Sequence, residues 1–239
     1  MKVCLVSDTH AFYSTATQFV LKWFWRCIAR EDFDVLIHAG DWATRSFSSI
    51  LPSLDQLRSA IDKPVLTVLG NHDLWLEPSD LASYEIIKHQ LREWFEMYDI
   101  LYLSEKSFVR DSLIITGFDG WYSNTNPPTK DCDRLPNDVT MSALSFNTQR
   151  SLERVFREIE GYEKRVCVTH FPPFDSYGRD SQSREYMGAN PKYLEFLKAN
   201  FQIVCVGHDH QAYDRHFDSC RVINPGGNYD DPSFVIFEV

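Results

Sequence analysis

A run of apolar residues that ends abruptly in a polar loop is the feature that most constrains this chain. Residues 64–69, Pro-Val-Leu-Thr-Val-Leu, are followed at once by Gly70-Asn71-His72-Asp73. Aliphatic and β-branched residues followed by Gly and Asn are typical of a buried strand that ends in a tight loop. Open α/β sheets bind their ligands at such strand ends. An amide oxygen that can ligate a cation and an imidazole that can carry a proton are therefore expected side by side.

The same arrangement recurs at four other places. Short apolar runs end at Asp8-Thr9-His10, Gly40-Asp41, His170 and Gly207-His208-Asp209-His210. Helical spacing of apolar residues predicts helices near 15–30, 48–61, 80–97, 141–160 and 191–199. Strands that alternate with helices predict an α/β fold, and the strand-rich C-terminal third predicts a second β-sheet packed on the first.

Composition predicts one soluble globular domain over residues 1–239. Hydrophobic residues make up 44% of the chain, and the formal net charge of −10 argues against non-specific binding to nucleic acid or to anionic membranes. The six cysteines include no C-x-x-C pair, and three lie in apolar strand-like runs. Without a signal-peptide core or an apolar run long enough to span a bilayer, the chain is expected to be reduced and cytoplasmic.

The residues at the five strand ends are hard or borderline metal ligands, and none is a cysteine. Mixed oxygen and nitrogen donors predict two divalent cations, with Asp41 as the candidate bridge between them. Two cations about 3.5–4 Å apart stabilise the attacking and leaving oxygens of an in-line displacement at phosphorus, and a metal-bound hydroxide is the nucleophile. His72 is the candidate general acid or charge stabiliser.

The order D-x-H, G-D, G-N-H-D, H, G-H-x-H resembles that of the calcineurin-like metallophosphoesterases. The motifs run from Asp8 to His210, and every motif position is occupied. The resemblance implies a four-layer αββα sandwich, with two packed mixed β-sheets flanked by helices and the metal site at the strand ends.

The resemblance also implies a role for each site residue. One metal ion would be held by Asp8, His10, Asp41 and His210, and the other by Asp41, Asn71, His170 and His208. His72 would face the scissile phosphate. Mn²⁺, Fe and Zn²⁺ all suit these ligands, and Mn²⁺ is the first choice in vitro.

One departure from the family pattern follows Asp41. The protein Ser/Thr phosphatases of this superfamily continue G-D-x-V-D-R-G, whereas this chain has Trp-Ala-Thr-Arg-Ser at 42–46. Thr44 replaces the aspartate that orients the catalytic histidine in that branch, so the partner that orients His72 stays open and a protein phosphatase is disfavoured. Arg45 is still expected within reach of a phosphate oxygen.

Three further polar residues lie within the motifs or next to them. His38, inside a strand, is expected to be a core histidine or to support a ligand. Asp73 is expected either to orient His72 or to cap the following turn. Asp209, between two ligands, is expected to point away from the metals.

Two segments outside the motifs are candidates for binding substrate. Arg179 and Arg184 follow His170 and could bind a phosphate bidentately, with a solvated loop as the alternative. The stretch 118–136 has no periodicity and is either a lid over the site or an ordinary surface loop.

Together these features favour a phosphodiesterase or broad phosphatase that cleaves small-molecule phosphoesters. A nuclease of the same superfamily is the first alternative; it would need a basic groove, which the acidic net charge disfavours. The second alternative is a non-catalytic interaction scaffold on this fold. The chain retains every ligand and the candidate catalytic histidine, which argues against a scaffold.

Overall fold

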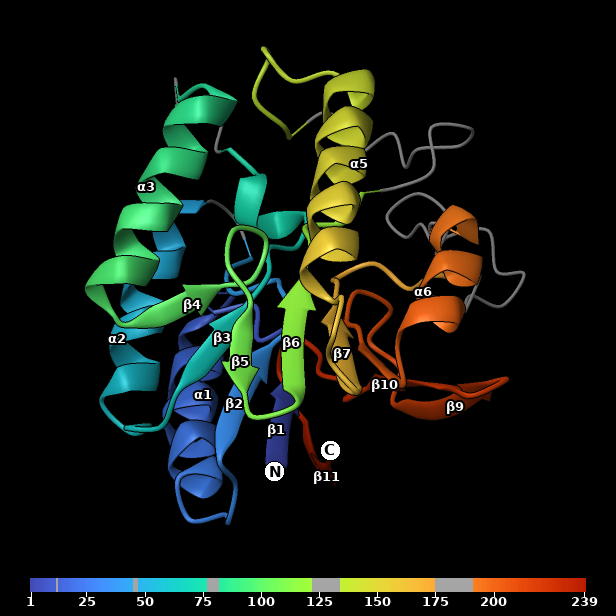
Figure 1. Ribbon diagram of the computed structural model, residues 1–239. Helices are drawn as coiled ribbons and strands as arrows, with labels where there is room; N and C mark the ends of the chain where they lie inside the picture. Colours follow the sequence, from blue (N-terminus) through green and yellow to red (C-terminus); the bar gives the residue numbers. More distant parts are fainter. Residues whose placement is uncertain (12, 45–46, 77–81, 122–133, 175–190) are drawn as a thin grey trace.

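The computed structural model describes residues 1–11, 13–44, 47–76, 82–121, 134–174 and 191–239 (Figure 1). Three predicted substrate-binding residues, Arg45, Arg179 and Arg184, lie outside the described residues, as does the central part of the 118–136 stretch.

The first sheet has five strands in the order β11-β1-β2-β3-β4. Its strands are β1 Lys2–Val6, β2 Val35–His38, β3 Val65–Thr67, β4 Ile100–Tyr102 and β11 Phe234–Glu238. Strands β1 to β4 are parallel, and β11 pairs antiparallel with β1. The carboxyl ends of β1, β2 and β3 therefore meet at one edge of the sheet.

The second sheet has six strands in the order β5-β6-β7-β8-β10-β9. Its strands are β5 Phe108–Arg110, β6 Leu113–Gly117, β7 Lys164–Val168, β8 Ile203–Cys205, β9 Tyr213–Phe217 and β10 Cys220–Asn224. Strands β6, β7, β8 and β10 are parallel, whereas β5 and β9 pair antiparallel at the two edges.

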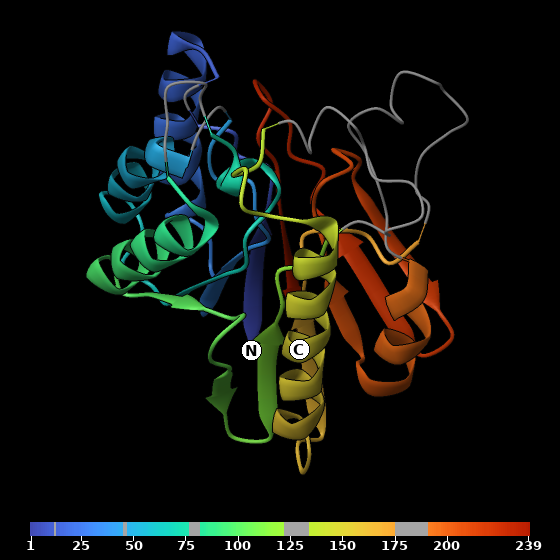
Figure 2. The same ribbon diagram turned by 90° about the horizontal axis from the view of Figure 1, so that it is seen from above.

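Helices cover the outer face of each sheet, as Figures 1 and 2 show. Beside the first sheet lie α1 Thr15–Ile28, α2 Ile50–Arg58 and α3 Tyr84–Met97; beside the second lie α5 Met141–Glu158 and α6 Leu194–Asn200. Short 3₁₀ turns are η1 Phe47–Ser49, η2 His72–Leu74 and η4 Pro191–Tyr193. Ser14, Ser83 and Thr140 cap α1, α3 and α5 through side-chain oxygens.

Successive side chains along each strand point to opposite faces of the sheet, so each sheet contributes to a separate core on each of its faces. In β1, Val3 and Leu5 pack into the core between the two sheets, whereas Cys4 and Val6 pack into the core beneath α1–α3. A third core joins α5 and α6 to the other face of the second sheet. Two mixed sheets flanked by helices, as predicted, are confirmed.

The structure corrects three details of the sequence interpretation. Strand β4 was not expected, because its three residues carry no alternation signal and are recognised only by pairing with β3. Helix α3 begins at Tyr84 rather than near residue 80, after the Ser83 cap. On α1, helical spacing predicts that Phe19 and Trp23 share the buried face with Phe24 and Ile28, but the two side chains are 73% and 69% exposed. The face toward the sheet carries Leu21, Phe24, Trp25 and Ile28.

The sequence also predicts buried thiols and no membrane-spanning segment. Cys4, Cys167 and Cys205 are free and fully buried, as their apolar strand context predicts. Among the helices that the structure describes, none has the length and hydropathy needed to cross a membrane.

Candidate metal centre

The seven predicted ligands converge where the strands end. Asp8 and His10 follow β1, Asp41 follows β2, Asn71 follows β3, His170 follows β7, and His208 and His210 follow β8. All are buried except His210, whose side chain is 14% exposed. Residues as far apart in the sequence as Asp8 and His210 thus share one polar cluster between the two sheets.

Five of these seven residues have left-handed backbone conformations. Their φ angles are 52° at Asp8, 44° at His10, 59° at Asp41, 74° at His208 and 52° at His210. Such conformations cost a non-glycine residue roughly 1–2 kcal/mol and concentrate at functional sites.

Hydrogen bonds between the loops hold these conformations. The amide of Asp8 donates to the Gly40 carbonyl at 3.0 Å, and that of His10 donates to the Asp41 carbonyl at 3.1 Å. The amide of His208 donates to the Asp8 carboxylate at 3.0 Å. The three loops therefore position one another.

One group of donor atoms belongs to Asp8, His10 and His210. The Nε2 atoms of the two histidines are 3.0 Å apart, and Nε2 of His210 is 3.4 Å from Oδ1 of Asp8. Donors bound to one ion at about 2.0–2.2 Å lie roughly 3–4 Å apart. These three side chains therefore have the spacing of ligands that share a cation.

A second group belongs to Asp41, His170 and His208. Nε2 of His170 is 3.4 Å from Oδ2 of Asp41, and Nδ1 of His208 is 3.1 Å from Oδ1 of Asn71. Oδ2 of Asp41 is also 3.7 Å from Nε2 of His10, in the first group. His10, Asp41 and His72 form a third such group, so Asp41 lies between His10 and His170.

Gly70 permits the close approach of the β2 and β3 loops. A Cβ atom at position 70 would lie 2.0 Å from Oδ1 of Asp41. The same carboxylate oxygen accepts a hydrogen bond from the His72 amide at 3.0 Å. Only glycine leaves room for the Asp41 carboxylate in this place.

The electrostatics of the cluster fit divalent cations. Over the described residues, the ion pairs of the buried Asp8 and Asp41 carboxylates are with histidines. Burial lowers the pKa of His170, but the Asp41 and Asp8 carboxylates and hydrogen bonds to Asp41 and Ala39 outweigh it and raise that pKa to about 10. The two buried carboxylates thus favour positive charge at His170, and divalent cations would supply positive charge to the same carboxylates.

Backbone carbonyls hold two of the imidazole rings. Nδ1 of His170 donates to the Ala39 carbonyl at 2.7 Å, so its Nε2 faces Asp41. Nδ1 of His72 donates to the Thr44 carbonyl at 2.8 Å, so its Nε2 faces the Asp41 carboxylate at 3.9 Å. Histidine ligands and acids are commonly oriented by a hydrogen bond from the second ring nitrogen.

The group that orients His72, which the sequence left open, is the Thr44 carbonyl. The Thr44 hydroxyl donates to the His10 carbonyl at 2.6 Å, and the Thr44 amide donates to the Ala11 carbonyl at 3.3 Å. A main-chain oxygen anchored in this way orients His72 without the aspartate of the protein phosphatases.

Asp73 caps the loops instead of contacting the His72 ring. Its carboxylate accepts hydrogen bonds from the amides of Gly70, Asp41 and Trp42 at 2.9, 3.0 and 2.8 Å. Burial, followed by the nearby Asp41 carboxylate, raises the pKa of Asp73 to about 8. These contacts match neither of the two roles expected for Asp73, because the carboxylate joins the β2 loop to the start of the β3 loop instead of orienting His72 or capping the turn that follows.

The other polar neighbours lie behind the ligands. His38 is buried, stacks on Trp42 with centroids 3.6 Å apart, and shares a 3.0 Å hydrogen bond with the Thr9 hydroxyl. The Asp209 carboxylate accepts from Asn224 Nδ2 at 2.5 Å and belongs to neither donor group. Both arrangements agree with the expectations for these residues.

Two aromatic residues of the site were not anticipated from sequence. Trp75 stacks on His72 with centroids 3.5 Å apart, and Tyr229 stacks on His10 at 4.2 Å. Trp75 follows the G-N-H-D motif closely, which is a usable signal. Tyr229 lies far from every motif in the sequence and reaches the cluster only through the fold.

Comparison with known proteins gives one family match and several similar structures. The model of the calcineurin-like phosphoesterase family matches residues 1–212, whereas no curated protein matches the chain. Phosphopantetheinyl hydrolase from Mycobacterium tuberculosis is similar, with 18% identity and a TM-score of 0.72 over 96% of this chain and 90% of that one.

Two other solved structures share the fold. A putative 5′-nucleotidase from Staphylococcus aureus has 16% identity and a TM-score of 0.58 over 100% of this chain and 51% of that one. GAP50, the anchor in the inner membrane complex of Plasmodium, has 14% identity and a TM-score of 0.56 over 99% and 80%. Because the family model covers most of the chain, and its motif residues meet in one cluster, the protein belongs to the calcineurin-like phosphoesterase family.

Proposed function

We propose that the protein is a dinuclear metal-dependent phosphohydrolase that cleaves small-molecule phosphoesters. The observation that carries the proposal is the position of Asp41, whose Oδ2 lies 3.7 Å from Nε2 of His10 and 3.4 Å from Nε2 of His170. Asp8, His10, Asp41 and His210 would hold one cation, and Asp41, Asn71, His170 and His208 the other. When bound, the cations would neutralise phosphoryl oxygens and lower the pKa of the attacking water.

His72 is suited to the proton transfer that the leaving oxygen needs. Its Nδ1–H is donated to the Thr44 carbonyl, so a proton that the ring transfers would be carried on Nε2, on the side of Asp41. The ring is packed between Trp75 and His10 and its side chain is 9% exposed, which fixes its direction while leaving it open toward substrate. A positioned general acid contributes about 10²–10⁴-fold to turnover.

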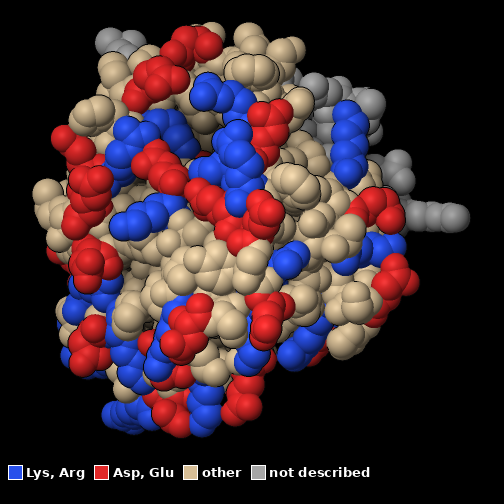
Figure 3. Space-filling model, in the orientation of Figure 1, with Lys and Arg blue, Asp and Glu red and all other residues tan. Residues whose placement is uncertain are grey.

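The formal net charge of −10 favours a small substrate over a nucleic acid. On the face shown in Figure 3, Lys and Arg are interspersed with Asp and Glu instead of forming a continuous basic stripe. A nuclease would need such a stripe beside its site, because phosphate contacts dominate nucleic-acid affinity. Free buried thiols further favour a reducing, cytoplasmic environment.

Three variants test the proposal in Mn²⁺-supplemented assays of a phosphodiester and a phosphomonoester chromogen. His72→Ala should lower turnover by about 10²–10⁴-fold while bound metal, measured by elemental analysis, stays near the wild-type value. Asp41→Ala should lose metal and turnover together. His89→Ala, an exposed histidine on α3 paired with Glu93, is the matched control and should keep both.

The outcomes separate the candidate functions. Diester cleavage alone would identify a phosphodiesterase, and a preference for the monoester would identify a phosphatase. Equal loss of metal in the His72 and Asp41 variants would contradict the role given to His72. Metal-loaded protein that cleaves neither chromogen nor DNA nor RNA would support the scaffold alternative.

A further inference from the structure

The segment after β10 brings an aromatic side chain to the metal cluster. A Cβ atom at Gly227 would lie 2.4 Å from the Ser7 carbonyl oxygen, so the chain passes directly against the residue that precedes Asp8. The amides and carbonyls of Asn228 and Asp231 then exchange two hydrogen bonds of 3.1 Å. Tyr229 therefore lies at the tip of a closed two-residue turn.

This turn is anchored on helix α1. The Thr17 hydroxyl, in the first turn of α1, donates to Oδ1 of Asp230 at 2.8 Å, and Thr17 is fully buried. The same end of α1 is capped by Ser14, and the preceding Tyr13 donates its amide to the His10 carbonyl at 3.3 Å. Two segments more than 200 residues apart are thus held side by side at the metal cluster.

The rings of Tyr229 and Tyr13 continue a stack that begins at the metal-ligand candidate His10, and Tyr13 forms its solvent-exposed end. The Tyr229 ring stacks on His10, with centroids 4.2 Å apart and planes inclined by 25°, and it lies 5.3 Å from His210 and 6.4 Å from His72. The Tyr13 ring follows at 4.7 Å from Tyr229 and is 44% exposed. We call this pair of tyrosines the aromatic wall.

Packing against His10 is enough to explain why Tyr229 lies at this place, but it does not explain the position of Tyr13. The only ring within the described chain that contacts Tyr13 is Tyr229, and nearly half of Tyr13 faces solvent. A flat aromatic surface beside a phosphate-binding cluster suits a second flat group joined to that phosphate, because offset stacking of aromatic rings is favourable. An aliphatic alcohol would gain little from such a surface.

We propose that the aromatic wall binds a planar aromatic group of the substrate, so that the preferred phosphoesters are nucleotide-like instead of aliphatic. The inference rests on the proposed phosphohydrolase function and assigns it a substrate class. Stacking of a base on an aromatic side chain is worth about 5- to 150-fold in affinity.

Adenosine 5′-monophosphate and ribose 5-phosphate are a matched pair of probes, because both are phosphate esters of the primary 5-hydroxyl of ribose and only the first carries a base. Their methyl diesters extend the comparison to a diesterase. In wild-type protein with Mn²⁺ we expect kcat/KM to favour the base-bearing ester by about 5- to 150-fold. Tyr13→Ala should bring that ratio close to one through a higher KM for the base-bearing ester, and Tyr13→Phe should retain it.

Two further variants guard against loss of structure. Tyr229→Ala should also remove the preference for the base-bearing ester. Because the Tyr229 ring stacks on His10, the bound metal of this variant is measured alongside its kinetics. Phe19→Ala removes an exposed aromatic side chain elsewhere on α1 and should change neither rate. A wild-type ratio near one, or a ratio that survives Tyr13→Ala, would overturn the aromatic wall as a substrate site.

A binding measurement separates this inference from the proposed function. If no ester is hydrolysed, the phosphohydrolase proposal fails, and equilibrium dialysis still compares adenosine 5′-monophosphate with ribose 5-phosphate. Tighter binding of the nucleotide that is lost in Tyr13→Ala would support the wall. Equal binding of the two probes would refute it.

Discussion

Replacing Asp119 by asparagine should destabilise the protein although Asp119 is not a predicted ligand. The Asp119 carboxylate, just after β6, accepts hydrogen bonds from Lys88 Nζ at 2.6 Å and from the Leu69 amide at 2.9 Å. It also accepts from Ser104 Oγ at 2.6 Å and from the Tyr102 hydroxyl. Leu69 directly precedes the G-N-H-D motif, so this carboxylate secures the backbone from which that loop starts.

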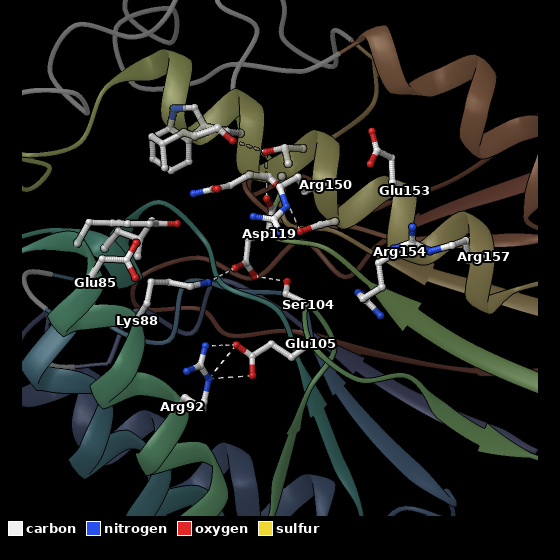
Figure 4. A pocket seen from close by; sticks show the side chains of 18 residues that line it. Glu85, Lys88, Arg92, Ser104, Glu105, Asp119, Arg150, Glu153, Arg154 and Arg157 are labelled. Atoms are coloured by element: carbon white, nitrogen blue, oxygen red, sulfur yellow. Dashed lines mark hydrogen bonds and ion pairs between the residues drawn. The ribbon is translucent and has the colours of Figure 1, made fainter.

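The magnitude follows from burial of the ion pair. The side chains of Lys88 and Asp119 are only 17% and 19% exposed at the base of a cavity of about 660 Å³ between α3 and α5 (Figure 4). Removing one partner of a buried pair costs roughly 3–5 kcal/mol, and this partial exposure reduces the expected loss to about 2–4 kcal/mol. For a chain of this size that corresponds to a fall in Tm of roughly 4–16 °C.

The assay is urea unfolding of metal-free protein at pH 7, with Glu105→Gln as the matched control. Glu105 pairs with Arg92 in the same cavity at 2.8 Å, but these side chains are 38% and 44% exposed. An exposed pair contributes at most about 1 kcal/mol, so the control should change the free energy of unfolding little.

The pH dependence of the difference has a definite sign. Burial raises the pKa of Asp119, but Lys88 and the hydrogen bonds outweigh burial and hold that pKa below its usual value. The contribution of Asp119 is therefore complete above the unfolded pKa of about 3.9 and is lost as pH falls through the lower folded value. The stability gap between wild type and Asp119→Asn should be constant around neutral pH and shrink in acid.

A compensating change completes the test. Lys88→Met in the Asp119→Asn background removes the uncompensated charge and should recover part of the lost stability, because a buried pair costs most when only one partner is removed. A free energy of unfolding for Asp119→Asn within about 1 kcal/mol of wild type would refute this account of the network.

Two further predictions concern the metal cluster itself. Gly70→Ala should displace Asp41, since the new Cβ would lie 2.0 Å from its Oδ1, and should lower bound metal and turnover by roughly 10²-fold. Gly161→Asn is its control, because a Cβ there meets nothing within 4 Å and Asn tolerates φ of 86°. Mn²⁺ at about 100 times its Kd should stabilise wild type by about 2.7 kcal/mol for each site that it fills, a rise in Tm of roughly 5–11 °C per site, with no rise in Asp41→Ala. An equal rise in both proteins would contradict the ligand assignment.

Local sequence patterns determined the fold class and the positions of the candidate ligands. Apolar runs that stop at Gly, Asp, Asn or His depend only on neighbouring residues, and so does the helical spacing between them. Because parallel strands end at a common edge, the five polar clusters could be expected to meet, and the structure brings Asp41 next to both His10 and His170.

Tertiary structure alone decided which atoms orient and border the site. The Thr44 carbonyl that holds His72, and the Asp73 carboxylate that joins the β2 and β3 loops, act across about 30 residues, and main-chain partners leave no signature in side-chain identity. Tyr229 reaches His10 across more than 200 residues, through a turn fixed by Thr17. Such contacts form only when the packed sheets bring distant loops together, so no local pattern of residues could predict them.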